Sequence, residues 1–453
     1  MNIYNLTEIT KRELDSNLLL SVLAANQEHE VLVTNMTSLK FLNDKKILKP
    51  GVFHTKSLVH DEAKQKFHLS LKKNNMLITS LDEENGLVRK DLKIFAEQRF
   101  SNESLSVVDK VFCWGSHDFK YLRDKYPKYL SKFSLTGSPR VDMWQKKFLP
   151  YWTNNKKINR EEVLIVMNFA LVNGFETTEK IYKKMKLSGY FERSKGTEQE
   201  FLKYIEESKK FFLEFIDIIN FLSTEFSETK FVVRPHPREK ISTWESNIKK
   251  NKNIRIDNSG NFNQVLSFSK LIIHSGSTTS FYAAVNKVPI ISFVPITSDL
   301  SYGQIANELG KICKNKEEVK MEIENVFNNK SVIDNEKVEK IINFKIHFPK
   351  KLLSAESIVN IWEELDSKIN SKKNNFIKIK ILLFYLDIKT KIKQILFQIY
   401  KPNKKKILDN KFELLDYQTI KKKINLLCKI LNIKDHIDIK IISEKCFLIK
   451  KIK

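Results

Sequence analysis

Short apolar runs alternate with longer polar segments through the first part of the chain. The runs at 30–34, 76–79 and 110–115 are rich in β-branched and aromatic residues and are bounded by polar turns, which is typical of strands. The polar segments 56–73 and 118–125 lie between or after these runs and are expected to be helices. Repeated strand-turn-helix units at this spacing predict a mostly parallel sheet wrapped by helices.

A second series of the same kind follows 146–160, a polar and aromatic stretch without a clear pattern that suits a linker. The run 163–167 is apolar throughout, as expected for a strand buried on both faces. A long helix at 198–223 and further strands are expected at 231–234, 253–257, 271–274 and 289–294. The pattern therefore predicts an α/β protein with two doubly wound, Rossmann-type domains, at 1–150 and 160–365.

The pattern changes again in the last part, 374–453, which is expected to be a basic helical extension with a small tail unit. In the helix expected at 374–400, one apolar stripe recurs at three- and four-residue steps. It consists of Ile377, Ile381, Phe384, Ile388, Ile392, Ile395 and Ile399, with Lys378, Lys380, Lys389, Lys391 and Lys393 around it. The helix either lies on an anionic membrane surface or packs on the tail or a partner.

Composition narrows the functional classes. The chain has 453 residues, 42% of them hydrophobic and 29% charged, which describes a globular protein rather than a disordered one. The net charge of +25 indicates an anionic partner: nucleic acid, a membrane surface or a phosphorylated substrate. The four cysteines are scattered without a CxxC pair, and neither a signal peptide nor a membrane-length apolar span is visible. We expect a cytoplasmic protein with reduced thiols.

Three acids end the second of the expected strands, in the sequence Asp82-Glu83-Glu84-Asn85-Gly86. Carboxylates crowded together raise one another's pKa, which suits a general acid or base or a carboxylate nucleophile. A solvated acidic loop is the simpler interpretation of the same run.

A second candidate is the segment Arg234-Pro235-His236-Pro237-Arg238. The two prolines fix their own φ and favour extended conformations in the residues before them, so a stiff loop presents His236. The flanking arginines are fork-shaped donors for phosphate or carboxylate oxygens. Ligands of open α/β sheets bind at the carboxyl ends of strands, where this loop is expected. The alternative is a proline-rich turn with a surface histidine.

A third candidate is the hydroxyl-rich turn Ser275-Gly276-Ser277-Thr278-Thr279, which runs from an expected strand into a helix. Free N–H groups and the positive end of the helix dipole would make this turn a phosphate cradle. An ordinary Ser/Thr helix cap would have the same sequence.

Taken in order, these motifs resemble those of bacterial sialyltransferases and related CMP-sugar transferases of the two-Rossmann GT-B fold. In detail the chain is similar to the bacterial surface carbohydrate biosynthesis group, which resembles the Kdo transferases of capsule and lipopolysaccharide assembly. The resemblance covers 76–294 and rests on Leu81 to Leu87, Val111 to Gly115, Tyr126 to Lys128, Thr136 to Asp142, Asn168-Phe169, Arg234 to Glu239 and His274 to Thr279. Asn85 interrupts the acid-acid-glycine of the family, so Glu83 and Glu84 compete for the catalytic position.

The resemblance implies a GT-B-like fold whose two domains face a cleft that holds a nucleotide sugar. His236 would serve the leaving phosphate, and Glu84 or Glu83 would deprotonate the acceptor hydroxyl. Donor phosphate contacts are expected from Arg234, Arg238, Ser275, Ser277, Thr278 and Thr279, and acceptor-side or cleft contacts from Asp82, Gly86, Arg140 and Asn168. Neither a metal nor another cofactor is expected, because hydrogen-bond donors and a helix dipole can neutralise one CMP phosphate.

The expected reaction transfers a nonulosonic or Kdo-type acid from a CMP donor to a cell-surface polysaccharide or lipid-linked glycan. An alternative on the same fold transfers a polyol phosphate from a CDP-alcohol, as teichoic-acid polymerases do. A third reading is a non-enzymatic protein that binds nucleic acid or a membrane. No nucleic-acid-binding signature is visible, so a specific nucleic-acid partner is not expected. Peripheral attachment to the inner face of the plasma membrane would fit a lipid-linked acceptor.

Overall fold

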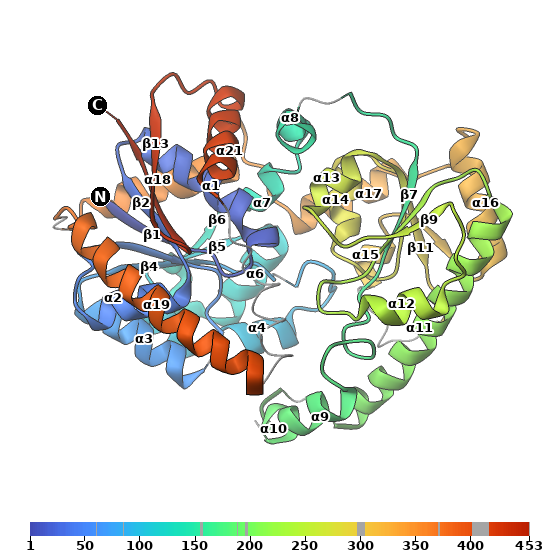
Figure 1. The fold of residues 1–453 in the computed structure, drawn as a ribbon, viewed down its shortest axis with the longest axis horizontal. Helices are drawn as coiled ribbons and strands as arrows, with labels where there is room; N and C mark the ends of the chain where they lie inside the picture. The colour runs from blue at the N-terminus through green and yellow to red at the C-terminus, as the bar shows by residue number, and fades with distance from the viewer. Residues whose placement is uncertain are drawn as a thin grey trace. The chain divides into compact units, whose positions relative to one another are not determined.

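The chain forms two compact units in a computed structural model (Figure 1). Unit 1 contains 1–85, 95–154 and 343–453, and unit 2 contains 86–94 and 155–342. The structure describes residues 1–59, 61–84, 86–154, 157–187, 189–194, 198–296, 304–369, 372–400 and 416–452. Asn85 of the acidic motif lies outside the described residues, as do the side chains of Lys393 and Ile399.

Unit 1 is built on an eight-stranded sheet in the order β13-β14-β2-β1-β3-β4-β5-β6. The six strands from the first part of the chain pair in parallel. They are β1 (Asn2–Leu6), β2 (Glu30–Thr34), β3 (Gly51–Thr55), β4 (Leu77–Leu81), β5 (Lys110–Cys113) and β6 (Phe133–Leu135). Strand order reverses between β1 and β3, and ligands of open α/β sheets bind at the carboxyl ends of strands on either side of such a reversal.

The parallel strands of unit 1 are linked by helices that bury their apolar faces on the sheet (Figure 1). The connecting helices are α1 (Thr10–Asn26), α2 (Met36–Asp44), α3 (Glu62–Lys73), α4 (Lys93–Arg99), α5 (Asn102–Val107), α6 (Ser116–Lys125), η1 (Pro127–Lys132), α7 (Pro139–Asp142), η2 (Lys146–Phe148) and α8 (Leu149–Thr153). Nearly all of α1 is buried, because it packs on α7, α18, α21 and β14. The first turn of α1 is therefore fixed in place beside the strand ends.

Unit 2 has a six-stranded sheet in the order β12-β11-β10-β7-β8-β9, with every pair parallel. The strands are β7 (Glu162–Val166), β8 (Phe231–Arg234), β9 (Ile254–Ile256), β10 (Ser269–His274), β11 (Ile290–Phe293) and β12 (Lys311–Cys313). Read from β9, this is the 3-2-1-4-5-6 order of a dinucleotide-binding sheet, with its switch point between β7 and β10. The Rossmann-type prediction for this part of the chain is confirmed.

Alternate apolar residues on one face of the sheet and the helices packed against that face form a core of unit 2, which includes Phe215, Trp244 and Phe293. The longest helix, α11, carries Phe211, Phe215 and two isoleucines on the face that contacts this core. The helices are α9 (Thr178–Leu187), α10 (Tyr190–Ser194), α11 (Glu198–Glu225), α12 (Ile241–Asn247), α13 (Phe262–Ser267), α14 (Thr279–Val285), α15 (Gln304–Asn307), α16 (Lys316–Phe327) and α17 (Asn335–Lys345).

After α17 the chain returns to unit 1, and here the structure differs from the expected domain range 160–365. Helix α18 (Ser354–Asp366) is capped by the Asp142 carboxylate, which accepts from the backbone N–H groups of Ser354 at 3.0 Å and Ala355 at 2.8 Å. Trp362 on α18 is fully buried and donates to the Thr79 hydroxyl at 3.1 Å. These contacts are all within unit 1, so the second domain ends before α18.

The last part of the chain also differs from the expectation for 374–453, a basic helical extension with a small tail unit outside the two domains. Strands β13 (Ile437–Ser443) and β14 (Cys446–Lys451) form a hairpin, and β14 pairs antiparallel with β2 (Figure 1). The buried residues Phe447, Leu448 and Ile449 extend the core and cover an edge of the sheet that would otherwise be open. Helices α19 (Phe376–Tyr400) and α21 (Tyr417–Ile430) pack on β13. Among the described residues, no helix is both long enough and apolar enough to cross a bilayer.

Candidate functional site

The acidic motif of unit 1 directly follows β4, and its three carboxylates have different surroundings. Asp82 is buried, and its Oδ1 accepts from the backbone N–H of Glu84 at 2.9 Å. Its Oδ2 has no hydrogen bond to a described residue and lies 3.7 Å from Arg99 Nη1. Burial raises the pKa of Asp82, and Arg99 lowers it by a smaller amount. The Asp82 backbone is held by the Trp114 indole, whose Nε1 donates to its carbonyl at 2.9 Å.

Glu83 is the more buried of the two competing glutamates, and its side chain is only 10% exposed. Arg140 Nη1 lies 3.6 Å from Glu83 Oε2 and donates to the Glu83 carbonyl at 3.2 Å. Within the described part of the chain, Glu83 Oε2 accepts no hydrogen bond. Burial raises the pKa of Glu83, and the charge of Arg140 only partly opposes this. A buried carboxylate with a raised pKa and an oxygen that accepts no hydrogen bond has the properties of a general base.

Glu84 is 51% exposed and lies between two arginines. Arg12 Nη1 donates to Glu84 Oε1 at 3.3 Å, and Arg99 donates to Oε2. Desolvation acts to raise the pKa of Glu84, but the two guanidinium groups outweigh it and the pKa lies below its ordinary value. Glu84 is therefore an ion-pair partner and a weaker base than Glu83.

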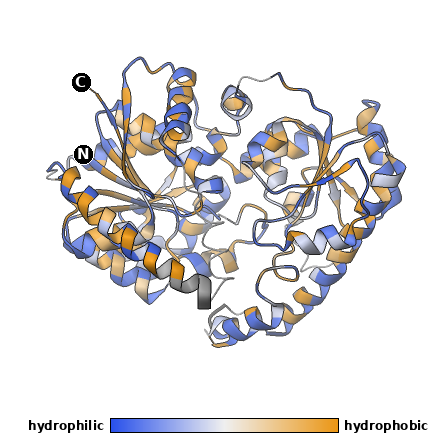
Figure 2. Cartoon of the chain, viewed as in Figure 1, coloured by the Kyte–Doolittle hydropathy of each residue, from blue (hydrophilic) through white to orange (hydrophobic). Residues whose placement is uncertain are grey.

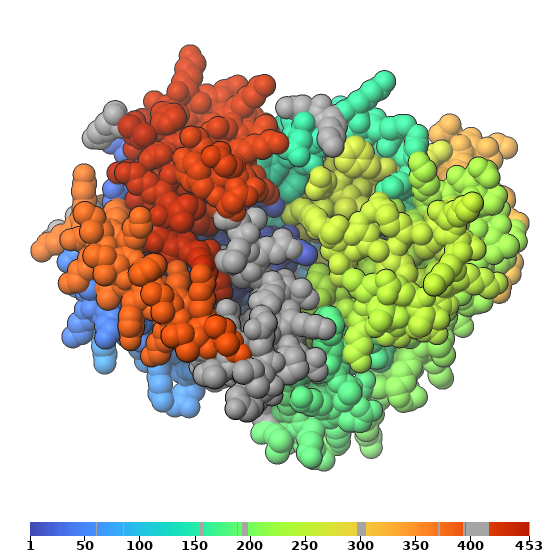
Figure 3. All heavy atoms as spheres, viewed as in Figure 1, coloured from blue at the N-terminus to red at the C-terminus, as the bar shows by residue number. Residues whose placement is uncertain are grey.

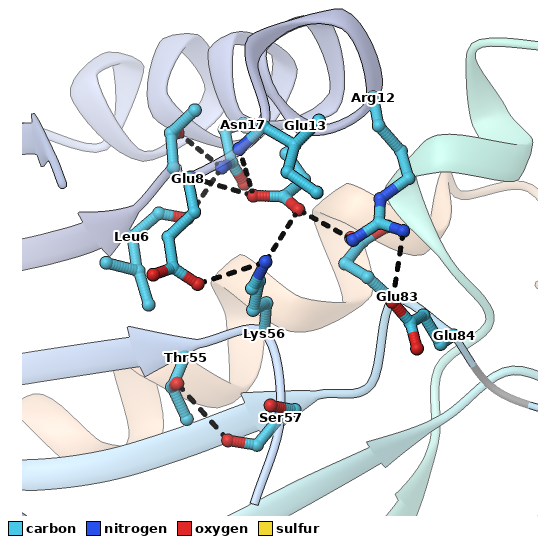
Figure 4. A network of polar contacts seen from close by, with 12 residues as sticks. Leu6, Glu8, Arg12, Glu13, Asn17, Thr55, Lys56, Ser57, Glu83 and Glu84 are labelled. Carbon is cyan, nitrogen blue, oxygen red and sulfur yellow. Dashed lines mark hydrogen bonds and ion pairs between the residues drawn. The ribbon is translucent and has the colours of Figure 1, made fainter. Parts of the chain in front are cut away.

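Sequence reasoning missed the centre of this network, which is Glu13 in the first turn of α1 (Figure 4). Glu13 is 1% exposed, and its Oε2 accepts from the backbone N–H groups of Glu8 at 2.8 Å and Ile9 at 3.1 Å. Its Oε1 lies 3.0 Å from Arg12 Nη2 and 3.1 Å from Lys56 Nζ. Burial opposes ionisation of Glu13, but Lys56 and Arg12 lower its pKa overall.

These residues meet because of the sheet topology. Glu8 follows β1, Lys56 follows β3 and Glu83 follows β4, and these three parallel strands are neighbours in the sheet. Acids are common in the first turn of a helix, where the helix dipole favours a negative charge, so the position of Glu13 does not mark a functional site. Nothing in the sequence indicates that Glu13 is buried against Lys56, so the signal for this cluster is weak.

In unit 2, the candidate loops lie at the carboxyl ends of adjacent strands. His274 at the end of β10 is aligned with Val166 of β7, and Val166 is aligned with Arg234 of β8. The His236 loop and the Ser/Thr turn therefore lie on either side of β7, at the edge where a Rossmann-type sheet binds nucleotides. Asn168, just after β7, is exposed on the same edge, and its Oδ1 accepts from the Ala170 N–H at 3.4 Å.

His236 is half-buried, and the backbone of its own loop holds the ring. Its Nδ1 accepts from the Arg238 N–H at 3.2 Å. In neutral imidazole, an Nδ1 that accepts places the proton on Nε2, so Nε2 is a donor. The exposed Arg238 thus contributes its backbone, and its guanidinium lies at the surface.

Glu239, which ends the Arg234 to Glu239 motif and was given no role from the sequence, is the buried support of this loop. Its Oε1 accepts from the backbone N–H groups of His236 and Phe169, both at 2.9 Å. Its Oε2 accepts from Trp244 Nε1 at 3.0 Å and from the Asn173 amide at 3.4 Å. Burial raises the pKa of Glu239, and these hydrogen bonds lower it by less. One carboxylate therefore joins the loop after β7 to the loop after β8.

Arg234 is engaged within the protein. Its guanidinium donates to the carbonyls of Ser259 at 2.6 Å and Gly260 at 2.8 Å. It therefore fixes the loop after β9 at the same sheet edge. Burial lowers the pKa of Arg234, and the nearby Asp257 carboxylate opposes this.

Most backbone donors of the Ser/Thr turn are already used. The N–H groups of Gly276, Ser277 and Thr279 donate to Asn307 Oδ1, His274 Nδ1 and Ser277 Oγ, at 2.7, 3.3 and 3.3 Å. Gly276 has φ +57°, a left-handed conformation that glycine adopts without strain. Helix α14 has seven residues, so its dipole is small. This turn would therefore contact a phosphate mainly through side-chain hydroxyl groups. Thr278 is exposed and Ser275 is half-buried, so both can reach a ligand.

The structure assigns the predicted residues to two sets. Asp82, Glu83, Glu84 and Arg140 belong to unit 1, and Gly86, with φ +50°, begins the short part of unit 2 that precedes α4. The remaining candidates are in unit 2, at the carboxyl edge of its sheet. In the described part of the chain, no three His, Cys, Asp or Glu side chains cluster as metal ligands.

No protein-family model matches the chain, and no curated protein does either. Solved structures do match. A histidine-to-asparagine variant of the wall teichoic acid polymerase TagF is 12% identical and covers 81% of this chain and 89% of its own, with a TM-score of 0.53. A TagF variant soaked with CDPG is 11% identical, with coverages of 82% and 90% and a TM-score of 0.50.

A putative UDP-N-acetylglucosamine 2-epimerase from Listeria monocytogenes is 12% identical and covers 82% of this chain and 97% of its own, with a TM-score of 0.50. These structural neighbours are GT-B-like enzymes of bacterial cell-surface glycan synthesis. At such identities the likeness shows the fold: two Rossmann-type units of the GT-B-like class. The finer resemblance to CMP-sugar transferases stays a prediction.

Proposed function

We propose that this chain is a metal-independent GT-B transferase of cell-surface glycan synthesis. The proposed reaction moves a nonulosonic or Kdo-type acid from a CMP donor to a polysaccharide or lipid-linked glycan at the cytoplasmic face of the membrane. The carrying observation is the carboxyl edge of the unit 2 sheet. There the His236 loop and the Ser/Thr turn lie on either side of β7 in a 3-2-1-4-5-6 sheet.

His236 would donate from Nε2 to the donor phosphate. The Arg238 N–H on Nδ1 supports this assignment, since it leaves Nε2 as the protonated nitrogen of the neutral ring. In the transfer step the glycosidic C–O bond to the phosphate breaks, and the phosphate oxygen gains negative charge. A hydrogen bond from Nε2 would stabilise that charge or deliver a proton to it.

Glu83 would accept the proton from the acceptor hydroxyl as the new C–O bond forms. Its burial, its raised pKa and an Oε2 that accepts no hydrogen bond from the described residues support Glu83 over Glu84. Arg12 and Arg99 hold Glu84 as an ion pair with a lowered pKa, so Glu84 would keep the loop in place.

A second candidate function keeps the fold and moves a polyol phosphate from a CDP-alcohol. The specific support is the likeness to the wall teichoic acid polymerase TagF, at a TM-score of 0.53. The two candidates share a cytidine nucleotide and differ in the bond that breaks. A sugar transferase releases CMP by cleaving the sugar–oxygen bond, whereas a polyol-phosphate transferase releases CMP by cleaving the diphosphate.

The test begins with nucleotide binding by the full-length protein. CMP, CDP, UDP and GDP are compared by thermal shift, and a ligand at 100 times its Kd should stabilise by about 2.7 kcal/mol. A shift with CMP or CDP alone supports a cytidine donor, and a shift with UDP alone would refute it. CMP-sialic acid, CMP-Kdo and CDP-glycerol then distinguish the two transferases by the product formed.

A matched pair of variants tests the base. Glu83→Gln should reduce turnover at least about 100-fold while nucleotide binding is retained. Glu84→Gln removes a neighbouring carboxylate of the same loop and should keep most of the turnover. Equal activity of Glu83→Gln and wild type in an assay with an identified donor would assign the base elsewhere.

A further inference from the structure

Helix α19 has two apolar faces on opposite sides, and only one of them packs on other described residues of the chain. At 3.6 residues per turn, Ile379 and Leu383 lie on one side, and both are fully buried. This side packs on α2 and on β13. The segment before the helix is fixed as well, because buried Asn374 accepts from the Tyr4 hydroxyl at 3.1 Å and from the Lys49 N–H at 3.0 Å.

The opposite face is exposed along the described length of the helix. It consists of Ile377 (76% exposed), Ile381 (64%), Phe384 (66%), Ile388 (44%), Ile392 (57%) and Ile395 (59%), with Tyr385 (58%) at its border. We call these residues the α19 stripe. Figure 2 shows hydrophobic positions along the coloured part of the helix, and Figure 3 shows α19, in orange, on the outer surface of the chain. The internal packing that sequence reasoning kept open thus uses a different face from this stripe.

Lysines border the stripe on both sides. By helical spacing, Lys378 and Lys389 lie along one border, and Lys380 and Lys391 lie along the other. All four side chains are exposed. The one acid of the helix, Asp387, is half-buried beside the hairpin, where its Oδ2 accepts from the Glu444 N–H at 3.4 Å. Among the described residues, the exposed face is therefore apolar in the middle and basic at the borders. One acid lies beside it: Glu444 of the hairpin forms an ion pair with Lys391.

We propose that the α19 stripe lies flat in the interface of an anionic lipid bilayer. The apolar side chains would enter the boundary between headgroups and acyl chains, and the lysines would reach the anionic headgroups. The charge pattern favours this occupant over a second copy of the chain, since two lysine-bordered stripes in contact would bring like charges together. This inference concerns a surface apart from both candidate sites and does not depend on the donor or the reaction.

The test is sedimentation of the full-length protein with vesicles at low salt. The protein should pellet with phosphatidylglycerol vesicles and bind phosphatidylcholine vesicles at least about tenfold more weakly. Ile381→Asp combined with Ile388→Asp should weaken partitioning into phosphatidylglycerol at least about 100-fold. Lys378→Gln and Lys389→Gln should each weaken it about fivefold, with the effect lost in high salt.

The matched control places the same charges on exposed apolar residues of unit 2. Leu213 is 64% exposed and Val332 is 87% exposed, so Leu213→Asp with Val332→Asp should leave partitioning unchanged. Each variant should have the same melting temperature as the wild type, which shows that it is folded. Failure of the wild-type protein to pellet with phosphatidylglycerol would overturn the proposal, and so would equal loss in the control. A dimer that dissociates in the stripe variant, without any vesicle binding, would assign the stripe to self-association and also overturn it.

Discussion

Glu239→Gln tests whether one buried carboxylate holds the His236 loop in place. The substitution keeps an oxygen that can still accept from the backbone N–H groups of His236 and Phe169. It replaces Oε2 by an NH₂ group, which would then face Trp244 Nε1 and the Asn173 amide. Donors would meet donors at contacts that are 3.0 and 3.4 Å long in the protein.

The expected loss of stability follows from these contacts. A buried donor without an acceptor costs about 1–3 kcal/mol. Trp244 loses its acceptor and bears this cost in full. Asn173 still donates to the Lys240 carbonyl at 3.2 Å, so we count about half of the cost for it. Burial raises the pKa of Glu239, so removing the charge returns part of its desolvation cost. We expect a net loss of about 2 kcal/mol, or about 4–8 °C in the melting temperature of a unit this size.

The assay is thermal unfolding followed by calorimetry and tryptophan fluorescence. Trp244 is the one tryptophan between 155 and 342, so its emission reports on unit 2. Glu245→Gln is the matched control: it makes the same chemical change at an exposed position of α12 and should shift the melting temperature by less than about 1 °C. If Glu239→Gln melts with the wild type, the carboxylate does not support the loop and the reasoning from its four contacts fails.

Three further predictions concern other parts of the structure. His236→Ala should melt like the wild type and lose at least about 100-fold in turnover; unchanged turnover with an identified donor would remove His236 from the reaction. A chain ending at Asp366 lacks β14, so circular dichroism should show loss of unit 1 structure; a native-like spectrum and melting transition would contradict this. Burial lowers the pKa of His274 from 6.5 to about 3. Between these two pH values the unfolded state binds a proton at His274 and the folded state does not. The free energy of unfolding should therefore fall by about 1.4 kcal/mol per pH unit below 6.5 because of His274. Urea unfolding at pH 7 and pH 5 measures this fall, and it should be smaller by that amount in His274→Asn.

Much of the α/β alternation could be read from the sequence, because strands such as β7 are continuous apolar runs. Strand β1 was missed because Asn2 and Asn5 interrupt its apolar pattern. Both asparagines are buried, and their amides donate to the Pro50 and Asn17 carbonyls at 2.9 and 3.3 Å. Burial of a polar side chain depends on such partners, which local periodicity does not show.

Local sequence patterns also could not predict that the chain returns to unit 1 after residue 342. The approach is close: a Cβ on Gly115 would lie 2.3 Å from the Lys345 carbonyl oxygen. A single glycine does not indicate which distant segment will lie against it. The helix at 376–400 was predicted, but only one apolar stripe was counted, and the structure buries the other side.

The candidate loops were located correctly at strand ends, because turn residues and prolines mark those ends locally. The electrostatics could not be predicted in the same way. Glu83 and Glu84 are adjacent in sequence, yet their pKa values move in opposite directions, since one is buried beside Arg140 and the other is held by Arg12 and Arg99. Those partners come from α1, α4 and α7, which only the tertiary fold brings to the motif.

The pairing of β14 with β2 has a consequence for synthesis. Nearly all of unit 2 comes from one continuous stretch, 155–342, so its sheet can form as soon as that stretch has left the ribosome. The sheet of unit 1 gains its final strand only when residues 446–451 emerge and join residues made some 400 positions earlier. Until then the β2 edge is unpaired, and an unpaired strand edge can pair with another chain.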